Sequence, residues 1–285
     1  MRTDLADSAI SPARSGHDIL ISLSAFGADE VRRHGQLWFA ELSLAAGADG
    51  VEVRSELLLD AARELPALAK LVAAHGKRVV YSCADGLWNT DGRLDQRALE
   101  DSLTAAHALG ARQLKMSIGG FDCGSHTSLC HLHQQLQSAD VELLIENDQT
   151  DMAGTLSALQ YFFYSAQAKG LSLGMTFDMG NWHWTGECAQ QAATAFAPQV
   201  RYVHCKGVQR QPQRWVAVPL AQSSAPWRAI LRKLPAGVPW AIEYPLAGDD
   251  LAEVTRREIA DLRQLAQVLA KQKNSPASTH PWAPA

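Results

Sequence analysis

Eight short apolar segments, each followed by a helical stretch, constrain the fold of this chain more than any other feature. They begin at Ile19, Gly50, Arg78, Gln113, Val141, Leu171, Val200 and Trp240. Four glycines, at positions 47, 76, 110 and 170, each follow a helical stretch and precede a strand, where glycine is favoured because it adopts the left-handed conformation easily. Such alternation implies parallel strands joined by right-handed crossovers. Eight units predict a closed (β/α)8 TIM barrel, with an open doubly wound sheet as the alternative.

The domain organisation follows from the same pattern. With 285 residues, 47% of them hydrophobic, the chain can bury a large core, and barrels of this size form one domain. We predict a flexible lead-in over residues 1–16 and one barrel domain over residues 17–272. The Pro-, Ser- and Ala-rich end, residues 273–285, is predicted to be disordered.

Composition excludes several functional classes. The net charge of −4 comes without a basic cluster, which argues against a nucleic-acid partner. No apolar run is long enough to span a membrane, and the N-terminus lacks the apolar segment of a secretory signal. The five cysteines are odd in number and scattered, as expected of free thiols, and the sequence predicts a cytoplasmic protein. No Gly-x-Gly-x-x-Gly motif follows a strand, so no nucleotide cofactor is expected.

Strands five to eight of the predicted barrel each end in a potential metal ligand. These residues are Glu146, Asp178, His204 and Glu243. Any one of them could be an ordinary strand-end or capping residue, but the ends of all strands face one mouth of a barrel, so the four are expected to converge. Three carboxylates and one imidazole suit Mn²⁺ or Mg²⁺, with Co²⁺ and Zn²⁺ as alternatives.

This set of side chains predicts proton transfer next to a carbonyl group. A divalent cation that chelates a keto sugar stabilises an enediolate as a Lewis acid. Glu146 and Glu243 are the expected acid/base pair, because two strands separate them around the ring. A glycosidase using the same two glutamates is the alternative, but it would leave Asp178 and His204 without a role.

Other polar residues near the strand ends are candidates for binding substrate. Lys206, two residues after His204, and Lys115 on the fourth strand could hold a carboxylate or phosphate, or be exposed loop cations. Glu52 could bond a substrate hydroxyl or pair with Arg54. Tryptophans 88, 182 and 184 could stack on a sugar or cover the barrel mouth.

The four strand endings resemble those of the xylose-isomerase-like TIM-barrel superfamily of sugar isomerases and epimerases. They are Ile145-Glu-Asn-Asp148, Phe177-Asp-Met-Gly-Asn181, Tyr202-Val-His-Cys-Lys206 and Ile242-Glu-Tyr-Pro245. The resemblance implies one divalent metal held by the same four side chains, with the two glutamates as acid/base catalysts. It is also compatible with a homodimer.

Longer segments resemble a narrower group, the epimerase-like proteins of 2-ketogluconate utilisation. These segments are Ser22–Asp29, Glu146–Thr150, Thr176–Trp182 and Glu243–Asp250. The resemblance implies a sugar acid or sugar-acid phosphate as substrate, with 2-ketogluconate as one candidate. Compared with ketose 3-epimerases of the superfamily, Asn181 replaces a substrate-binding His and Met152 replaces a Glu, whereas Arg210 matches a substrate-binding Arg.

We therefore predict a metal-dependent sugar isomerase or epimerase that acts on a small keto sugar or sugar acid. One alternative is a non-catalytic sugar-acid binding protein. Another is an abasic-site endonuclease of the same superfamily, although those enzymes use three zinc ions and extra histidines at earlier strand ends, which this chain lacks. The Cys and His residues between positions 123 and 133 do not match a zinc pattern, and we expect a loop leading into a helix there.

Overall fold

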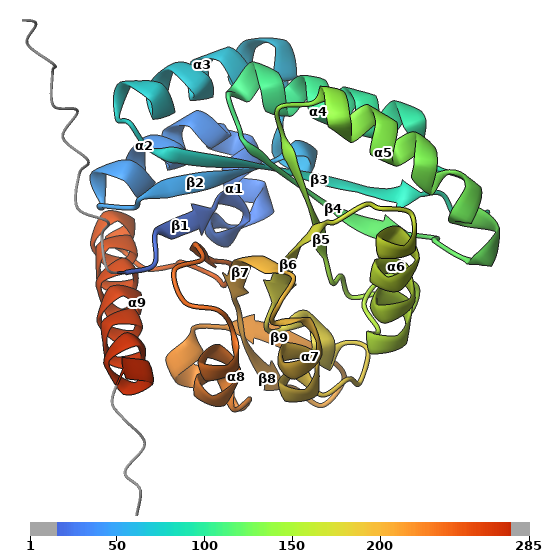
Figure 1. Cartoon of the computed structure of the whole chain (residues 1–285). Coiled ribbons are helices and arrows are strands. Elements are labelled where there is room, and N and C mark those ends of the chain that lie inside the picture. The colour runs from blue at the N-terminus through green and yellow to red at the C-terminus, as the bar shows by residue number, and fades with distance from the viewer. Residues whose placement is uncertain (1–15, 275–285) are drawn as a thin grey trace, which may run out of the picture.

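Eight apolar segments pair edge to edge as parallel strands and close into a barrel in the computed structural model, which describes residues 16–274 (Figure 1). Neighbouring strands follow the order β1-β10-β7-β6-β5-β4-β3-β2. The barrel strands are β1 (Ile19–Ser22), β2 (Gly50–Arg54), β3 (Arg78–Trp88), β4 (Gln113–Gly119), β5 (Glu142–Glu146), β6 (Gly174–Asp178), β7 (Val200–Cys205) and β10 (Trp240–Ile242). The predicted (β/α)8 barrel is confirmed.

Helices surround the barrel on its outer side (Figure 1). They are α1 (Ala28–His34), α2 (Gln36–Ala45), α3 (Ala61–Ala74), α4 (Gln96–Leu109), α5 (Leu129–Ser138), α6 (Leu156–Ala168), α7 (Ala189–Phe196), α8 (Trp227–Lys233) and α9 (Leu251–Asn274). The last helix packs against α2 and β1, so the two ends of the barrel domain meet. No helix within residues 16–274 combines the length and apolar character needed to cross a bilayer.

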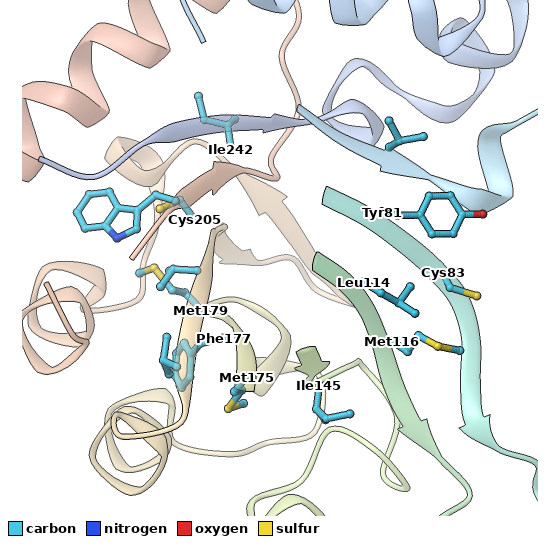
Figure 2. Close-up of a cluster of buried hydrophobic side chains, with 14 of the residues drawn as sticks. Tyr81, Cys83, Leu114, Met116, Ile145, Met175, Phe177, Met179, Cys205 and Ile242 are labelled. Atoms are coloured by element: carbon cyan, nitrogen blue, oxygen red, sulfur yellow. The ribbon is translucent and has the colours of Figure 1, made fainter. Parts of the chain in front are cut away.

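Side chains alternate between the two faces of each strand, and this alternation separates the core from the site. In Figure 2, Leu114 and Met116 on β4 and Met175 and Phe177 on β6 lie outside the barrel, where they join the layer packed against the helices. A smaller apolar cluster is made by Leu20, Val80, Leu144, Tyr202 and Ala241. These residues come early in their strands, and the residues two positions later are polar. The barrel interior is therefore apolar at one end and charged near the carboxyl ends of the strands.

Apart from small shifts of strand ends, the structure differs from the predicted elements in three places. The helical stretch that the pattern predicts after the first apolar segment is divided in two, because Gly35, with φ of 80°, separates α1 from α2. Strands β3 and β4 continue beyond residues 82 and 117 and stay paired as an arm at the barrel mouth. Gly119 (φ of 60°) permits this, because a Cβ there would lie 2.2 Å from the Trp88 carbonyl oxygen. An antiparallel hairpin of β8 (Gly207–Arg210) and β9 (Trp215–Val218), not foreseen, follows β7.

The predicted termini are only partly covered by the structure. Helix α9 continues to Asn274, beyond the expected domain end at residue 272. Residues 1–15 and 275–285, which make up nearly all of the predicted lead-in and tail, lie outside the described residues.

Candidate metal centre

Four strand ends bring the predicted metal ligands to one point. Glu146 and Asp178 are the last residues of β5 and β6, His204 is next to last in β7, and Glu243 directly follows β10. One potential ligand atom from each lies within 4.8 Å of the others. Among the described residues this is the one group of His, Cys, Asp and Glu side chains arranged to hold a metal ion.

The imidazole of His204 is at the centre of this group. Its Nδ1 atom lies 2.9 Å from Glu146 Oε1, 2.8 Å from Glu243 Oε2 and 3.8 Å from Asp178 Oδ2. Its Nε2 atom lies 2.7 Å from Glu52 Oε2. Burial alone would lower the pKa of His204, but the carboxylates of Glu243 and Glu52 outweigh burial and raise this pKa well above its ordinary value. Since Nε2 is held by Glu52, Nδ1 is the nitrogen that would bind a shared cation, after giving up the proton that the raised pKa keeps on the ring.

Two buried carboxylate oxygens at this point fit a cation because they accept no hydrogen bond of ordinary geometry. They are Glu146 Oε1 and Asp178 Oδ2. Each has an ionic partner nearby: His204 Nδ1 lies 2.9 Å from Glu146 Oε1, and Lys206 Nζ lies 2.6 Å from Asp178 Oδ2. The other oxygen of Asp178 is fully used, since it accepts from the backbone N–H groups of Gly180 and Asn181 at 2.7 and 2.9 Å. Buried polar atoms are normally satisfied, and hard oxygen donors beside an imidazole suit a small divalent cation.

Burial and charge act against each other on these carboxyl groups. Burial would raise the pKa of Glu146, but Lys115 and His204 hold it below its ordinary value. Glu243 behaves in the same way, with His204 and Lys206 holding its pKa well below the usual range. The pKa of Asp178 is raised, because burial outweighs the attraction of Lys206. Both glutamates are therefore carboxylates at neutral pH, which a metal ligand and a proton acceptor must be.

A buried asparagine that the sequence did not single out fixes the position of Asp178. Asn147, the residue after β5, donates from Nδ2 to the carbonyl oxygen of Asp178 at 3.0 Å and accepts from its backbone N–H at 2.9 Å. Asn181 Nδ2 in turn donates to the carbonyl oxygen of Asn147 at 2.9 Å. These bonds join the ends of β5 and β6, so Asp178 Oδ2 is the atom left for a ligand.

Three cations lie among the carboxylates. Lys206 Nζ is 2.6 Å from Asp178 Oδ2 and 2.8 Å from Glu243 Oε2, and it donates to Asn181 Oδ1 at 3.0 Å. Lys115 Nζ is 2.6 Å from Glu146 Oε2. Burial would lower the pKa of each lysine, but the neighbouring carboxylates raise it. Both lysines are thus charged and buried, which differs from the alternative reading of exposed loop cations.

Arg54 is the third cation, and the sequence suggests it only as a partner of Glu52. Its guanidinium donates to Glu243 Oε1 at 2.8 Å, to Glu52 Oε1 at 3.1 Å and to Glu56 Oε1 at 2.9 Å. The signal was present in the sequence, because Arg54 ends β2 and shares a strand face with Glu52.

Glu52 lies beneath His204 and does not line the open cavity. It is fully buried, and its Oε1 also accepts from Ser22 Oγ at 3.0 Å. Burial would raise its pKa, but His204, Lys115 and Arg54 lower it. Both oxygens already contact protein groups, Arg54 among them, so Glu52 is placed to orient His204, and its expected contact with a substrate hydroxyl stays a prediction.

A cavity of about 260 Å³ opens above the ligands at the barrel mouth. Its charged side is formed by Arg54, Lys115, Glu146, Lys206 and Glu243. Small residues of the paired strands β3 and β4 also line it: Ser82, Cys83, Ala84 and Ser117. This volume accommodates a small polar molecule.

The remaining expected substrate contacts divide into two groups. Asn181 lines the cavity, but it is 5% exposed and its amide is bonded on both sides, to Asn147 and to Lys206 and Gln149. Arg210 is exposed on the hairpin, with its guanidinium 5.4 Å from the Trp215 ring centroid, and does not line the cavity. The structure therefore brings Asn181 to the site and leaves Arg210 outside it.

Two of the three tryptophans, Trp88 and Trp182, and the Cys/His segment belong to the fold, whereas Trp184 is half-buried. Trp182 is fully buried between Phe177 and Phe196, with ring centroids 5.6 and 5.9 Å away. Trp88 is also buried and donates from Nε1 to Ser128 Oγ at 2.9 Å. Residues 123–127 form a short 3-10 turn that leads into α5, as expected of a loop followed by a helix.

Solved structures share this architecture at low sequence identity. An L-ribulose 3-epimerase is 15% identical with a TM-score of 0.69, covering 93% of this chain and 99% of that one. The probable 3-DHS dehydratase AsbF from Bacillus anthracis is 12% identical with a TM-score of 0.65, covering 86% and 98%. A D-allulose 3-epimerase from Methylomonas sp. is 13% identical with a TM-score of 0.60, covering 88% and 98%. These likenesses establish the fold.

Sequence comparison identifies the family. No curated protein sequence gives a significant match. A family model described as xylose isomerase-like TIM barrel matches residues 40–271, a span that runs from α2 into α9 and includes all four potential ligands. The chain therefore belongs to the xylose isomerase-like TIM barrel family.

Proposed function

We propose that this protein is an isomerase or epimerase that uses one divalent cation to act on a small keto sugar or sugar acid. The observation that carries the proposal is the convergence of Glu146, Asp178, His204 and Glu243 within 4.8 Å, with one oxygen of each carboxylate turned toward His204 Nδ1. Mn²⁺ or Mg²⁺ suits the oxygen-rich set best. When bound, such a cation polarises a substrate carbonyl and lowers the energy of an enediolate.

The two glutamates are suited to transferring a proton between the faces of a substrate. Their strands, β5 and β10, are separated by β6 and β7, so the carboxylates approach the cavity from different sides. Glu146 keeps Oε2 against Lys115, and Glu243 keeps Oε1 against Arg54, while the second oxygen of each faces His204 Nδ1. These cations keep the glutamates ionised, so either glutamate can accept a proton from a carbon next to the carbonyl.

Structural relatives support the general kind of reaction. The L-ribulose and D-allulose 3-epimerases named above act on small sugars, and their fold is the one found here. The narrower resemblance to proteins of 2-ketogluconate utilisation stays a prediction, as do Asn181, Lys115 and Arg210 as substrate contacts. The abasic-site endonuclease alternative is disfavoured, because residues 16–274 provide one group of metal ligands and three zinc ions would need more.

The proposal is tested by metal analysis and by proton exchange. Purified protein should retain close to one divalent metal ion per chain, and a keto sugar or keto acid incubated with it in D₂O should exchange its α-proton, followed by NMR. Glu146→Gln should slow exchange by about 100-fold or more. Glu56→Gln, which changes a carboxylate at the rim of the site, is the matched control and should exchange normally. Binding of keto acids without exchange under Mn²⁺, Mg²⁺, Co²⁺ or Zn²⁺ would instead identify a binding protein.

A further inference from the structure

The three cations of the cavity differ in which carboxylate oxygens they neutralise. Lys115 contacts Glu146 Oε2 at 2.6 Å and Glu52 Oε1 at 3.7 Å. Arg54 contacts Oε1 of Glu243, together with Glu52 and Glu56. Neither cation touches the oxygens that face His204 Nδ1. Both therefore keep their counter-charges when those oxygens bind a metal ion.

Lys206 is different because both of its carboxylate contacts are potential metal ligands. Its Nζ atom lies 2.6 Å from Asp178 Oδ2 and 2.8 Å from Glu243 Oε2. The same two oxygens lie 3.8 and 2.8 Å from His204 Nδ1, the nitrogen suited to a cation. An ammonium group and a divalent cation cannot both hold these oxygens at full strength, since the two like charges would lie only a few ångströms apart in a buried site.

We propose that Lys206 is a resident counter-ion of the metal site, displaced from Asp178 and Glu243 when a divalent cation binds and then available to a carboxylate of the substrate. Lys206 thereby makes substrate binding depend on metal binding, and it selects a sugar acid over a neutral sugar. The inference rests on the proposed function and names the substrate class of that site.

The surroundings of Lys206 allow this exchange of partners without moving the backbone. Its aliphatic stem packs against Gly180, where an added Cβ would lie 2.8 Å from Lys206 Cγ. The stem therefore lies close against the Gly180 backbone, and Nζ keeps Asn181 Oδ1 at 3.0 Å as a neutral acceptor. Lys206 and Asn181 both line the cavity, so a Lys206 ammonium group released by the carboxylates faces the space that a substrate would occupy. A buried ammonium group without a counter-charge is unfavourable, and a substrate carboxylate would supply that charge.

Metal titration tests the first half of the proposal. Calorimetry with Mn²⁺ is performed on chelator-treated wild-type protein and on Lys206→Met, with Lys206→Gln as a second variant should the first fold poorly. Loss of the competing ammonium should tighten Mn²⁺ binding by about tenfold or more. Lys115→Met is the matched control, because it also removes a buried cation but leaves the Lys206 contacts in place, and it should give a clearly smaller gain. Equal gains in both variants, or no gain in Lys206→Met, would overturn the proposal.

A matched pair of sugars tests the second half. D-Fructose and 2-keto-D-gluconate differ only at C1, which is a hydroxymethyl group in one and a carboxylate in the other. Mn²⁺-loaded wild-type protein should bind the acid at least about tenfold more tightly, and Lys206→Met should lose this preference. Equal binding of the two sugars by wild type would overturn the inference while leaving proton exchange, and thus the proposed function, intact. Failure of wild type to bind any divalent metal would instead overturn the proposed function and this inference with it.

Discussion

Replacing Glu52 with glutamine should weaken metal binding although Glu52 is not a ligand. Its Oε2 atom lies 2.7 Å from His204 Nε2, and its Oε1 accepts from Ser22 Oγ at 3.0 Å and from Arg54 Nη1 at 3.1 Å. The carboxylate thus favours a proton on Nε2, so that Nδ1, which faces the other potential ligands, is the nitrogen that gives up its proton when a metal ion binds. Glutamine has nearly the same shape but only one accepting oxygen.

Neither orientation of the new amide satisfies its neighbours. If its oxygen faces His204, its NH₂ group points at the donors Ser22 and Arg54. If its NH₂ group faces His204, Nε2 must accept, and the proton moves to Nδ1 and blocks the metal. Loss of such an outer carboxylate costs about 10- to 100-fold in metal affinity, or roughly 1.4 to 2.8 kcal/mol. We expect the Glu52→Gln variant to fall in this range.

Calorimetry with Mn²⁺ or Mg²⁺ on chelator-treated protein measures this effect. Circular dichroism confirms that the variant is folded before the titration. Glu56→Gln is the control, because Glu56 bonds the same Arg54 but not His204, and its metal affinity should stay within about twofold of wild type. A folded Glu52→Gln variant with wild-type metal affinity would refute the view that Glu52 orients His204.

Four further outcomes are expected. Chelation of the metal should remove about 2.7 kcal/mol of stability relative to protein in a free metal concentration of about 100 times the Kd. Calorimetry should show this loss as a fall in Tm of about 5–10 °C. Trp182→Ala should cost about 3–5 kcal/mol in denaturant unfolding, because its ring packs between Phe177 and Phe196. Asn147→Ala should leave the backbone N–H and carbonyl of Asp178 without these hydrogen bonds, and so lower stability by about 1–3 kcal/mol. It should also weaken metal binding; unchanged metal affinity would show that Asn147 does not position Asp178. His126→Ala, in the Cys/His segment, should leave the metal content unchanged by elemental analysis.

The sequence sufficed for the barrel and for the convergence of the ligands because both follow from periodic patterns. Apolar runs that end in Glu146, Asp178 and His204 place these residues at strand ends, and a closed ring leaves them one common mouth. The structure has these side chains within 4.8 Å of one another, together with Glu243. No detail of loop conformation was needed for that step.

Features that depend on tertiary contacts could not be predicted in the same way. The Ala84-Asp85-Gly86 stretch interrupts the apolar pattern of β3, yet the strand continues because β4 pairs with it beyond the barrel rim. The role of Glu52 depends on a contact with His204 across 152 positions of the chain. The two hydrogen bonds between the Asn147 side chain and the backbone of Asp178 leave no periodic signal in the sequence either.

The potential metal ligands and the small residues that line the barrel mouth come from different strands. All four potential ligands lie on β5 to β10, whereas Ser82, Cys83, Ala84 and Ser117 are on β3 and β4 and carry no formal charge at neutral pH in their ordinary protonation states. Larger or more polar side chains at these positions would reshape the space beside a bound sugar, while the ionic contacts of Arg54, Lys115 and Lys206 stay in place. Directed evolution of a new sugar preference should therefore begin at these four positions, because none of them is a potential metal ligand or one of the three buried cations.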